Sequence, residues 1–127
     1  MIYGIGTDIE KISRMKKIYY KNPSLVINKV LTLEEQEKFK KINIEKKKVE
    51  WLTGRFSAKE SLAKAIGLGF GKNFSFHDGA ILSDKNGKPV FIISNKLQEL
   101  LPKNVNIFVS ISHSIEYVTT LVVIEHN

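Results

Sequence analysis

The stretch Trp51-Leu-Thr-Gly-Arg-Phe-Ser-Ala-Lys-Glu-Ser-Leu-Ala-Lys-Ala-Ile-Gly67 decides the fold, because it is the longest convincing helix in the sequence. At about 100° per residue, its apolar side chains gather on one broad arc, which is typical of a helix packed into a core. The arc consists of Trp51, Leu52, Phe56, Ala58, Leu62, Ala63, Ala65 and Ile66. We therefore expect a helix over 51–67 with the other elements packed around it.

Four charged residues of this stretch lie where a purely structural helix would not put them. Arg55 and Lys59 fall inside the apolar arc, four residues apart on one face, and Glu60 and Lys64 form a second pair at its edge. Each alone could lay its stem on apolar neighbours and keep its charge in water. Together the cations need anionic partners, since an unpaired buried charge is costly. We interpret the pattern as a site for a bound anion.

The composition predicts one soluble domain. A chain of 127 residues with 43% hydrophobic and 26% charged residues can bury one core. No apolar run approaches the roughly 20 residues of a membrane span, and no signal-peptide pattern is present. The chain has no cysteine, which excludes disulfides and thiolate metal sites. We expect a single domain over 1–127, in the cytoplasm and not in a membrane.

The net charge of +7 favours anionic partners: nucleic acid, phosphorylated small molecules or an acidic protein. Only Arg14 and Arg55 of the 20 basic residues are arginine, which argues against sequence-specific DNA reading. A basic module that binds RNA or DNA through lysine contacts to the backbone is an alternative. It is disfavoured because aromatic residues are not interleaved with the lysine runs. We expect no nucleic acid partner.

The first ten residues are predicted to form a strand, with Gly4, Gly6, Asp8 and Glu10 on one face. The glycines would let another segment or a ligand approach closely, and Asp8 would project beside that space. Asp8 fits either of two roles, a cap of the following helix or a metal ligand.

The remaining patterns predict alternating short elements. They are a basic amphipathic helix over 11–20, a helix opened by the capping box Thr32-Leu-Glu-Glu35 and ending near 41, a polar helix connection over 40–50, a glycine stop at Gly67 with a loop to Gly71, a hairpin of 76–83 and 89–93 around Asn86-Gly87, a helix capped by Ser94 and ended by Pro102, and strands over 105–111 and 117–124. The basic helix face could meet an acidic helix of a partner.

His113 lies between the last two strands and is either a hydrogen-bonded turn residue or part of a site. Two carboxylates from distant parts of the chain, Asp8 and Glu60, could share a hard divalent cation. Mg²⁺ takes one or two carboxylates and fills its other positions with phosphate oxygens and waters. Lys64, Lys59, Arg55 and His113 would hold phosphates nearby. The implied chemistry is displacement at a phosphate.

The sequence resembles the holo-[acyl-carrier-protein] synthases, a class of 4'-phosphopantetheinyl transferases. The resemblance rests on Gly4-Ile-Gly-Thr-Asp-Ile9, on Gly54-Arg-Phe-Ser-Ala-Lys-Glu-Ser-Leu-Ala-Lys-Ala-Ile-Gly67 and on Ser110-Ile-Ser-His113. Weaker matches at Lys29-Val-Leu-Thr32 and Asn86-Gly-Lys-Pro-Val90 follow in the expected order. The similarity thus covers nearly the whole chain, and the joint order and spacing of the motifs are specific.

This resemblance implies a compact α+β domain, with an antiparallel sheet packed on a long central helix in a 4'-phosphopantetheinyl transferase-like fold. It also implies a homotrimer with sites between subunits. The implied reaction transfers the 4'-phosphopantetheine group of coenzyme A to a serine of apo acyl carrier protein. It would depend on Mg²⁺, release adenosine 3',5'-bisphosphate and serve fatty acid biosynthesis. An alternative keeps the phosphate chemistry but changes the substrate, as in another nucleotide-dependent transferase.

The resemblance also assigns residues by motif. Asp8 and Glu60 would bind Mg²⁺, and Glu60, Lys64 and His113 would be catalytic. Lys64 and Gly67 would contact coenzyme A, and Arg55, Lys59 and His113 would contact its phosphates or lie in the site wall. Arg14, Ile18 and Lys21 would meet the acyl carrier protein. One departure is clear, since the family usually has a hydrophobic residue and then a glutamate after Asp8-Ile9, where this chain has Glu10-Lys11. Adjacent strand residues face opposite ways, so the resemblance assigns Glu10 no role.

Overall fold

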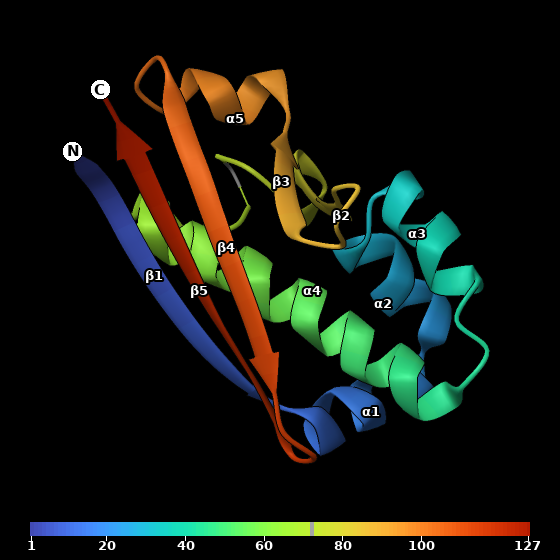
Figure 1. Cartoon of the computed structure of the whole chain (residues 1–127). Helices are drawn as coiled ribbons and strands as arrows, with labels where there is room; N and C mark the ends of the chain where they lie inside the picture. Colours follow the sequence, from blue (N-terminus) through green and yellow to red (C-terminus); the bar gives the residue numbers. More distant parts are fainter. Residues whose placement is uncertain (72) are drawn as a thin grey trace.

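Helix α4 (Glu45–Ile66) packs on one face of an antiparallel sheet, as Figure 1 shows. The computed structural model describes residues 1–71 and 73–127, and in these residues three strands form this sheet in the order β1-β5-β4. The strands are β1 (Ile2–Lys11), β4 (Val105–His113) and β5 (Tyr117–His126). This arrangement confirms the predicted antiparallel sheet on a long central helix.

Two glycines allow β1 to lie directly against α4. A Cβ atom added at Gly4 would lie 1.9 Å from the Ala65 carbonyl oxygen, and one at Gly6 would lie 2.0 Å from that of Ser61. Any side chain at either position would clash with helix backbone, so the contact requires glycine. The predicted close approach is therefore confirmed, and the approaching segment is α4.

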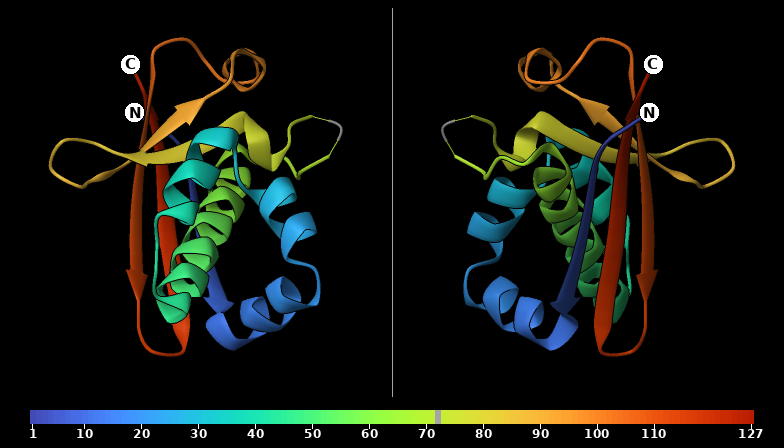
Figure 2. Two further views of the ribbon diagram at one scale, coloured as in Figure 1. Left: turned by 90° about the vertical axis from the view of Figure 1, so that its right-hand side faces the viewer. Right: turned by 90° about the vertical axis from the view of Figure 1, so that its left-hand side faces the viewer.

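Three short helices follow β1. They are α1 (Ile12–Lys21), α2 (Pro23–Val30) and α3 (Leu33–Lys40), and they share a hydrophobic core with the first half of α4. Figure 2 shows the sheet edge-on on one side of α4 and α2 on the other. The capping box of α3 is present, with Thr32 and Glu35 bonding to each other's main-chain N–H groups. Helix α2 is absent from the predicted elements, although Asn22 caps it and Pro23 occupies its first position.

The predicted helix connection over 40–50 is wrong, because α4 already begins at Glu45. Val49 is buried in the core that α4 shares with α1, α2 and α3, while Lys46 and Lys47 are exposed and Lys48 is half-buried. Lysine and glutamate are good helix formers, so a polar first turn does not end a helix. The polar composition of this interval therefore reflects an exposed helix surface.

The second half of the chain matches the predicted elements closely. A 3₁₀ turn (η1, Phe76–Asp78) precedes the hairpin of β2 (Gly79–Ser83) and β3 (Pro89–Ile93), and Ser94 caps α5 (Asn95–Glu99). These elements and the sheet enclose the other hydrophobic core with the second half of α4. Within the described part of the chain, no helix is both long and apolar enough to cross a membrane.

The sheet face opposite α4 is apolar and exposed. The register aligns Ile5 with Val123 and Phe108, and Thr7 with Leu121. Ile5 is 60% exposed, Ile9 65% and Phe108 47%. We call this surface the outer sheet face; it consists of Ile5, Thr7, Ile9, Phe108, Ser110, Ser112, Thr119, Leu121 and Val123. None of the described residues covers it in the single chain.

Candidate active site

Three carboxylates gather where β1 passes α4. Gly4 contacts Ala65 and Gly6 contacts Ser61, so each step of two residues along β1 moves four residues back along the helix. Asp8 thus comes beside the helix turn that carries Glu60. Glu10, on the same strand face as Asp8, joins them. We call Asp8, Glu10 and Glu60 the acidic edge.

The carboxylates of the acidic edge perturb one another. Burial is the main cause that raises the pKa of Glu10 to about 7, and the nearby carboxylates of Asp8 and Glu60 add to it. The charge of Arg14 opposes this rise. The pKa of Glu60 is also raised, first by burial and then by the charge of Asp8, against Lys64. Mutual repulsion of this kind is relieved by a cation.

Asp8 is held in place on one side and has a spare oxygen on the other. Lys64 Nζ donates to Asp8 Oδ1 at 3.1 Å and to the Thr7 carbonyl oxygen at 2.9 Å. The Asp8 side chain is only 9% exposed, and its buried Oδ2 accepts no hydrogen bond from the described residues. A fixed, buried and unpartnered carboxylate oxygen suits a hard cation such as Mg²⁺.

The described residues contain no group of three or more His, Cys, Asp or Glu side chains arranged as a metal site. Mg²⁺ does not need such a cage, because it binds through one or two carboxylates, substrate phosphates and waters. The acidic edge therefore fits Mg²⁺ that arrives with a phosphorylated substrate.

A cleft of about 820 Å³ opens beside the acidic edge. Glu10 and Glu60 line it together with two cations, Arg14 and Lys29. The rest of the lining is mostly apolar and consists of Met15, Ile18, Leu25, Val26, Val30, Phe56, Phe70, Gly71, Ser75 and Phe76. Phe56 stacks on Phe76 at 5.5 Å between ring centroids, and Phe76 on Phe70 at 4.0 Å. The cleft can hold an elongated ligand with a charged end and an apolar length.

His113 does not reach the acidic edge of its own chain. It ends β4, which β5 separates from β1 (Figure 1). Its Nδ1 lies 3.4 Å from Glu50 Oε2, ten residues before Glu60 on α4. Within one chain, the structure therefore separates His113 from Asp8, Glu60 and Lys64.

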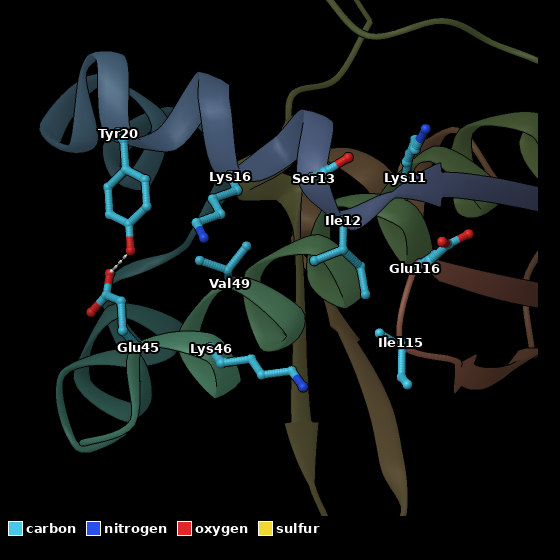
Figure 3. Close-up of a pocket in the computed structure, with 10 residues that line it drawn as sticks. All are labelled: Lys11, Ile12, Ser13, Lys16, Tyr20, Glu45, Lys46, Val49, Ile115 and Glu116. Carbon is cyan, nitrogen blue, oxygen red and sulfur yellow. Dashed lines mark hydrogen bonds between the residues drawn. The ribbon is translucent and has the colours of Figure 1, made fainter.

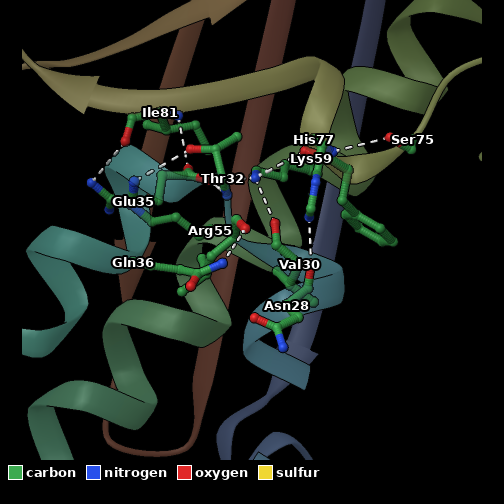
Figure 4. Close-up of polar contacts among 12 residues, drawn as sticks. Asn28, Val30, Thr32, Glu35, Gln36, Arg55, Lys59, Ser75, His77 and Ile81 are labelled. Atoms are coloured by element: carbon green, nitrogen blue, oxygen red, sulfur yellow. Dashed lines mark hydrogen bonds and ion pairs between the residues drawn. The ribbon is translucent and has the colours of Figure 1, made fainter. Parts of the chain in front are cut away.

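Lys59 lies in the interior, not in the cleft (Figure 4). Its Nζ donates to Glu35 Oε1 at 2.5 Å, to the Val30 carbonyl oxygen at 2.6 Å and to the Phe76 carbonyl oxygen at 3.0 Å. The Lys59 side chain is 1% exposed and that of Glu35 is 0% exposed. Of the two positions expected for Lys59, this arrangement agrees with a place in the site wall, because its three donors are used inside the protein by groups that include the wall residues Val30 and Phe76. The capping box marked Glu35, but nothing in the sequence paired it with Lys59.

Arg55 occupies the same interior cluster. Its Nη2 donates to the Ile81 carbonyl oxygen at 3.5 Å, and its guanidinium lies 4.2 Å from the Trp51 ring centroid. Burial lowers the pKa of Arg55 to about 10, against the charge of Glu35. Glu35 thus pairs directly with Lys59, where the sequence predicted a bound anion, and its charge also acts on Arg55, whose Nε has no hydrogen-bond partner among the described residues.

The predicted carrier-protein residues lie on α1. Arg14 and Ile18 line the cleft, and Lys21 is exposed at the end of the helix. A second hollow of about 450 Å³ lies along α1, where Tyr20 donates to Glu45 at 3.0 Å (Figure 3). Gly67 ends α4 in the left-handed conformation (φ 87°), which confirms the predicted glycine stop.

The comparisons with known proteins agree with this architecture. The family model for the 4'-phosphopantetheinyl transferase superfamily matches residues 4–121. A holo-[acyl-carrier-protein] synthase of a Geobacillus species is 48% identical over 98% of both chains, and that of Staphylococcus saprophyticus is 40% identical over 98% of this chain and 99% of the relative.

Solved structures of similar proteins have the same fold. The holo-[acyl-carrier-protein] synthase of Neisseria meningitidis has a TM-score of 0.89 at 35% identity, over 98% of this chain and 99% of that one. The Bacillus anthracis enzyme, in complex with coenzyme A (3',5'-ADP), has a TM-score of 0.85 at 35% identity, over 100% and 99%. These similarities confirm the predicted α+β fold.

Proposed function

The chain belongs to the holo-[acyl-carrier-protein] synthases of the 4'-phosphopantetheinyl transferase superfamily, and we propose that it transfers 4'-phosphopantetheine from coenzyme A to a serine of apo acyl carrier protein. The acidic edge beside the cleft carries this proposal, since it offers a cation site and room for an elongated phosphorylated ligand. The family model covers most of residues 1–127, which supports a single transferase domain. We place the reaction in the cytoplasm and in fatty acid biosynthesis, as the resemblance implies.

The proposed reaction is an in-line displacement at phosphorus. The serine oxygen forms a bond to the β-phosphorus of coenzyme A and gives up its proton to water or to a carboxylate of the site. The bond from that phosphorus to the bridging oxygen breaks, and adenosine 3',5'-bisphosphate leaves with the electron pair. Mg²⁺, when bound, would supply charge that offsets the negative charge on the leaving group.

The residues of the acidic edge would hold that ion. Asp8 offers its unpartnered Oδ2 and Glu60 faces the cleft, while Glu10, to which the sequence assigned no role, adds negative charge beside them. Lys64 is 54% exposed at its side chain, so its ammonium can turn toward a pyrophosphate beside Asp8. Gly67 leads into the loop that ends beside the cleft at Gly71, which supports a place for the nucleotide there.

A change of charge at Arg14 should weaken recognition of the carrier protein. Arg14→Glu is expected to raise the KM for acyl carrier protein by at least about tenfold while leaving the KM for coenzyme A within about threefold, because like charges repel an acidic partner. Steady-state kinetics with each substrate varied in turn measure both constants. Lys17→Glu makes the same charge change on an exposed α1 residue that lines neither hollow. Equal effects of the two variants would refute specific docking at Arg14.

We also propose a homotrimer that is built on the outer sheet face. Exposed isoleucines on β1 and Phe108 on β4 form a continuous apolar surface, and such surfaces mark interfaces. A second chain would also bring a His113 to the site, which the single chain cannot do. Sites between subunits therefore follow from the same arrangement.

Charged substitutions on this face should separate the subunits. Ile5→Lys/Ile9→Lys is expected to convert the trimer to monomers and to lower transfer at least about 50-fold, because buried unpaired lysines are costly. Light scattering after gel filtration measures the mass. Leu33→Lys, at a residue that is 77% exposed on α3, is the control. A double variant that keeps a trimeric mass would place the interface elsewhere.

Mass spectrometry tests the proposed transfer. Apo acyl carrier protein, incubated with the protein, coenzyme A and Mg²⁺, should gain roughly 340 Da on one serine, the mass of the transferred arm. If no mass is gained, the proposed transfer is rejected, and two alternatives remain: a different nucleotide-dependent transferase and a basic module that binds nucleic acid. The latter predicts binding that weakens steeply with salt and is indifferent to coenzyme A.

A further inference from the structure

The buried pair of Lys59 and Glu35 joins the ends of two helices. Lys59 Nζ bonds to the carbonyl oxygen of Val30, the last residue of α2, where helix carbonyls lack partners of their own. Glu35 Oε1 accepts from the N–H of Thr32 at 2.9 Å, at the start of α3. A cation at a helix C-terminus and a carboxylate at an N-terminus both suit the helix dipoles. The pair therefore fixes α2, α3 and α4 at one point.

The same ammonium also holds the opposite wall of the cleft. Its third acceptor is the carbonyl oxygen of Phe76, and both Val30 and Phe76 line the cleft. Lys59 precedes Glu60 of the acidic edge on α4. A second link runs parallel, because the His77 ring nitrogen bonds to the Asn28 carbonyl oxygen (Figure 4). Lys59 thus connects the cleft wall formed by α2, which contains Val30, to the wall formed by η1, which contains Phe76. Lys59 itself is buried and does not line the cleft.

We propose that Lys59, with Glu35 as its counter-ion, is a positioning residue that sets the distance between the two cleft walls and so the alignment of the substrates with the acidic edge. This inference rests on the proposed transfer. Two apolar side chains could fill the same volume, but they could not donate hydrogen bonds from one atom to the carbonyl oxygens of both Val30 and Phe76. The ammonium suits this task because its three donors converge from one atom.

The double variant Lys59→Met/Glu35→Gln separates positioning from stability. It removes the ammonium and its counter-ion together, and the buried Arg55 keeps the Ile81 carbonyl oxygen and the Trp51 ring as partners when the charge of Glu35 is lost. The amide oxygen introduced at position 35 can still accept from one of the two main-chain N–H groups that Glu35 bonds. We expect this variant to fold, as judged by circular dichroism. Measured well below its melting temperature, its kcat/KM for coenzyme A should fall at least about tenfold. Hydrogen exchange over 27–31 and 73–78 should quicken. Lys38→Met removes an exposed charge from α3 and is the control.

The variant Lys59→Arg provides a second test that keeps the charge. A planar guanidinium cannot direct its donors to the three acceptors as an ammonium does. We expect kcat/KM to fall at least about fivefold at a melting temperature within a few degrees of the parent. The inference is overturned if a folded double variant, or Lys59→Arg, keeps kcat and KM within twofold of the parent. Failure of the parent to transfer the group would instead reject the proposed function.

Discussion

Replacement of Asp8 and Glu60 by alanine together is expected to lower kcat/KM for transfer at least about a thousandfold without unfolding the protein. The two side chains supply the protein oxygens of the proposed metal site. Without the metal ion, the negative charge that develops in the transition state is no longer stabilised. The fold should tolerate the change because Lys64, the partner of Asp8, is 54% exposed, and the loss of two carboxylates relieves repulsion with Glu10. Steady-state transfer kinetics and a thermal melt measure the two effects.

A matched control for this variant exists on α3. Glu34→Ala/Glu37→Ala also removes two carboxylates, but both are exposed and away from the cleft. It should leave kcat/KM within about twofold of the parent. Activity of the Asp8→Ala/Glu60→Ala variant within about tenfold of the parent would reject the metal assignment.

Gly6→Ala is expected to produce a large loss of stability. Its Cβ would lie 2.0 Å from the Ser61 carbonyl oxygen and 2.7 Å from the Ala65 nitrogen, so β1 and α4 must separate. We expect a loss of at least about 3 kcal/mol, as for severe overpacking of a core. Urea denaturation at a fixed protein concentration measures it.

Gly69→Ala is the control for backbone entropy. At Gly69, no atom of the described residues lies within 4 Å of an added Cβ, and the backbone has no positive φ. A change within about 1 kcal/mol is expected there. A similar small change at Gly6 would show that β1 does not need glycine to pack on α4.

The sequence predicted the elements whose patterns are local. The glycine face of β1, the capping box of α3 and the hairpin at Asn86-Gly87 depend on residues within a few positions of one another, and these predictions are confirmed. Helix α2 was missed because Pro23 directly follows the amphipathic pattern of 11–20 and marks its end, although proline also begins helices. The start of α4 was missed because an exposed helix turn has the same composition as a loop.

The candidate site shows where local patterns stop being informative. Asp8 and Glu60 could be chosen from residue type and motif, but Glu10 required the strand face that it shares with Asp8. Lys59 looked like a phosphate ligand because its counter-ion lies 24 positions away, on a helix whose packing no periodicity reveals. His113 lies on β4, which β5 separates from β1, and the order of the motifs along the chain does not reveal this separation.

Binding of Mn²⁺ in place of Mg²⁺, followed by its electron paramagnetic resonance signal, tests the acidic edge most directly. With coenzyme A present, the parent protein should bind one ion per chain, and Asp8→Asn/Glu60→Gln should weaken binding at least about a hundredfold, because the two carboxylates provide the charged oxygens. Equal Mn²⁺ affinity in the parent and this variant would contradict the site.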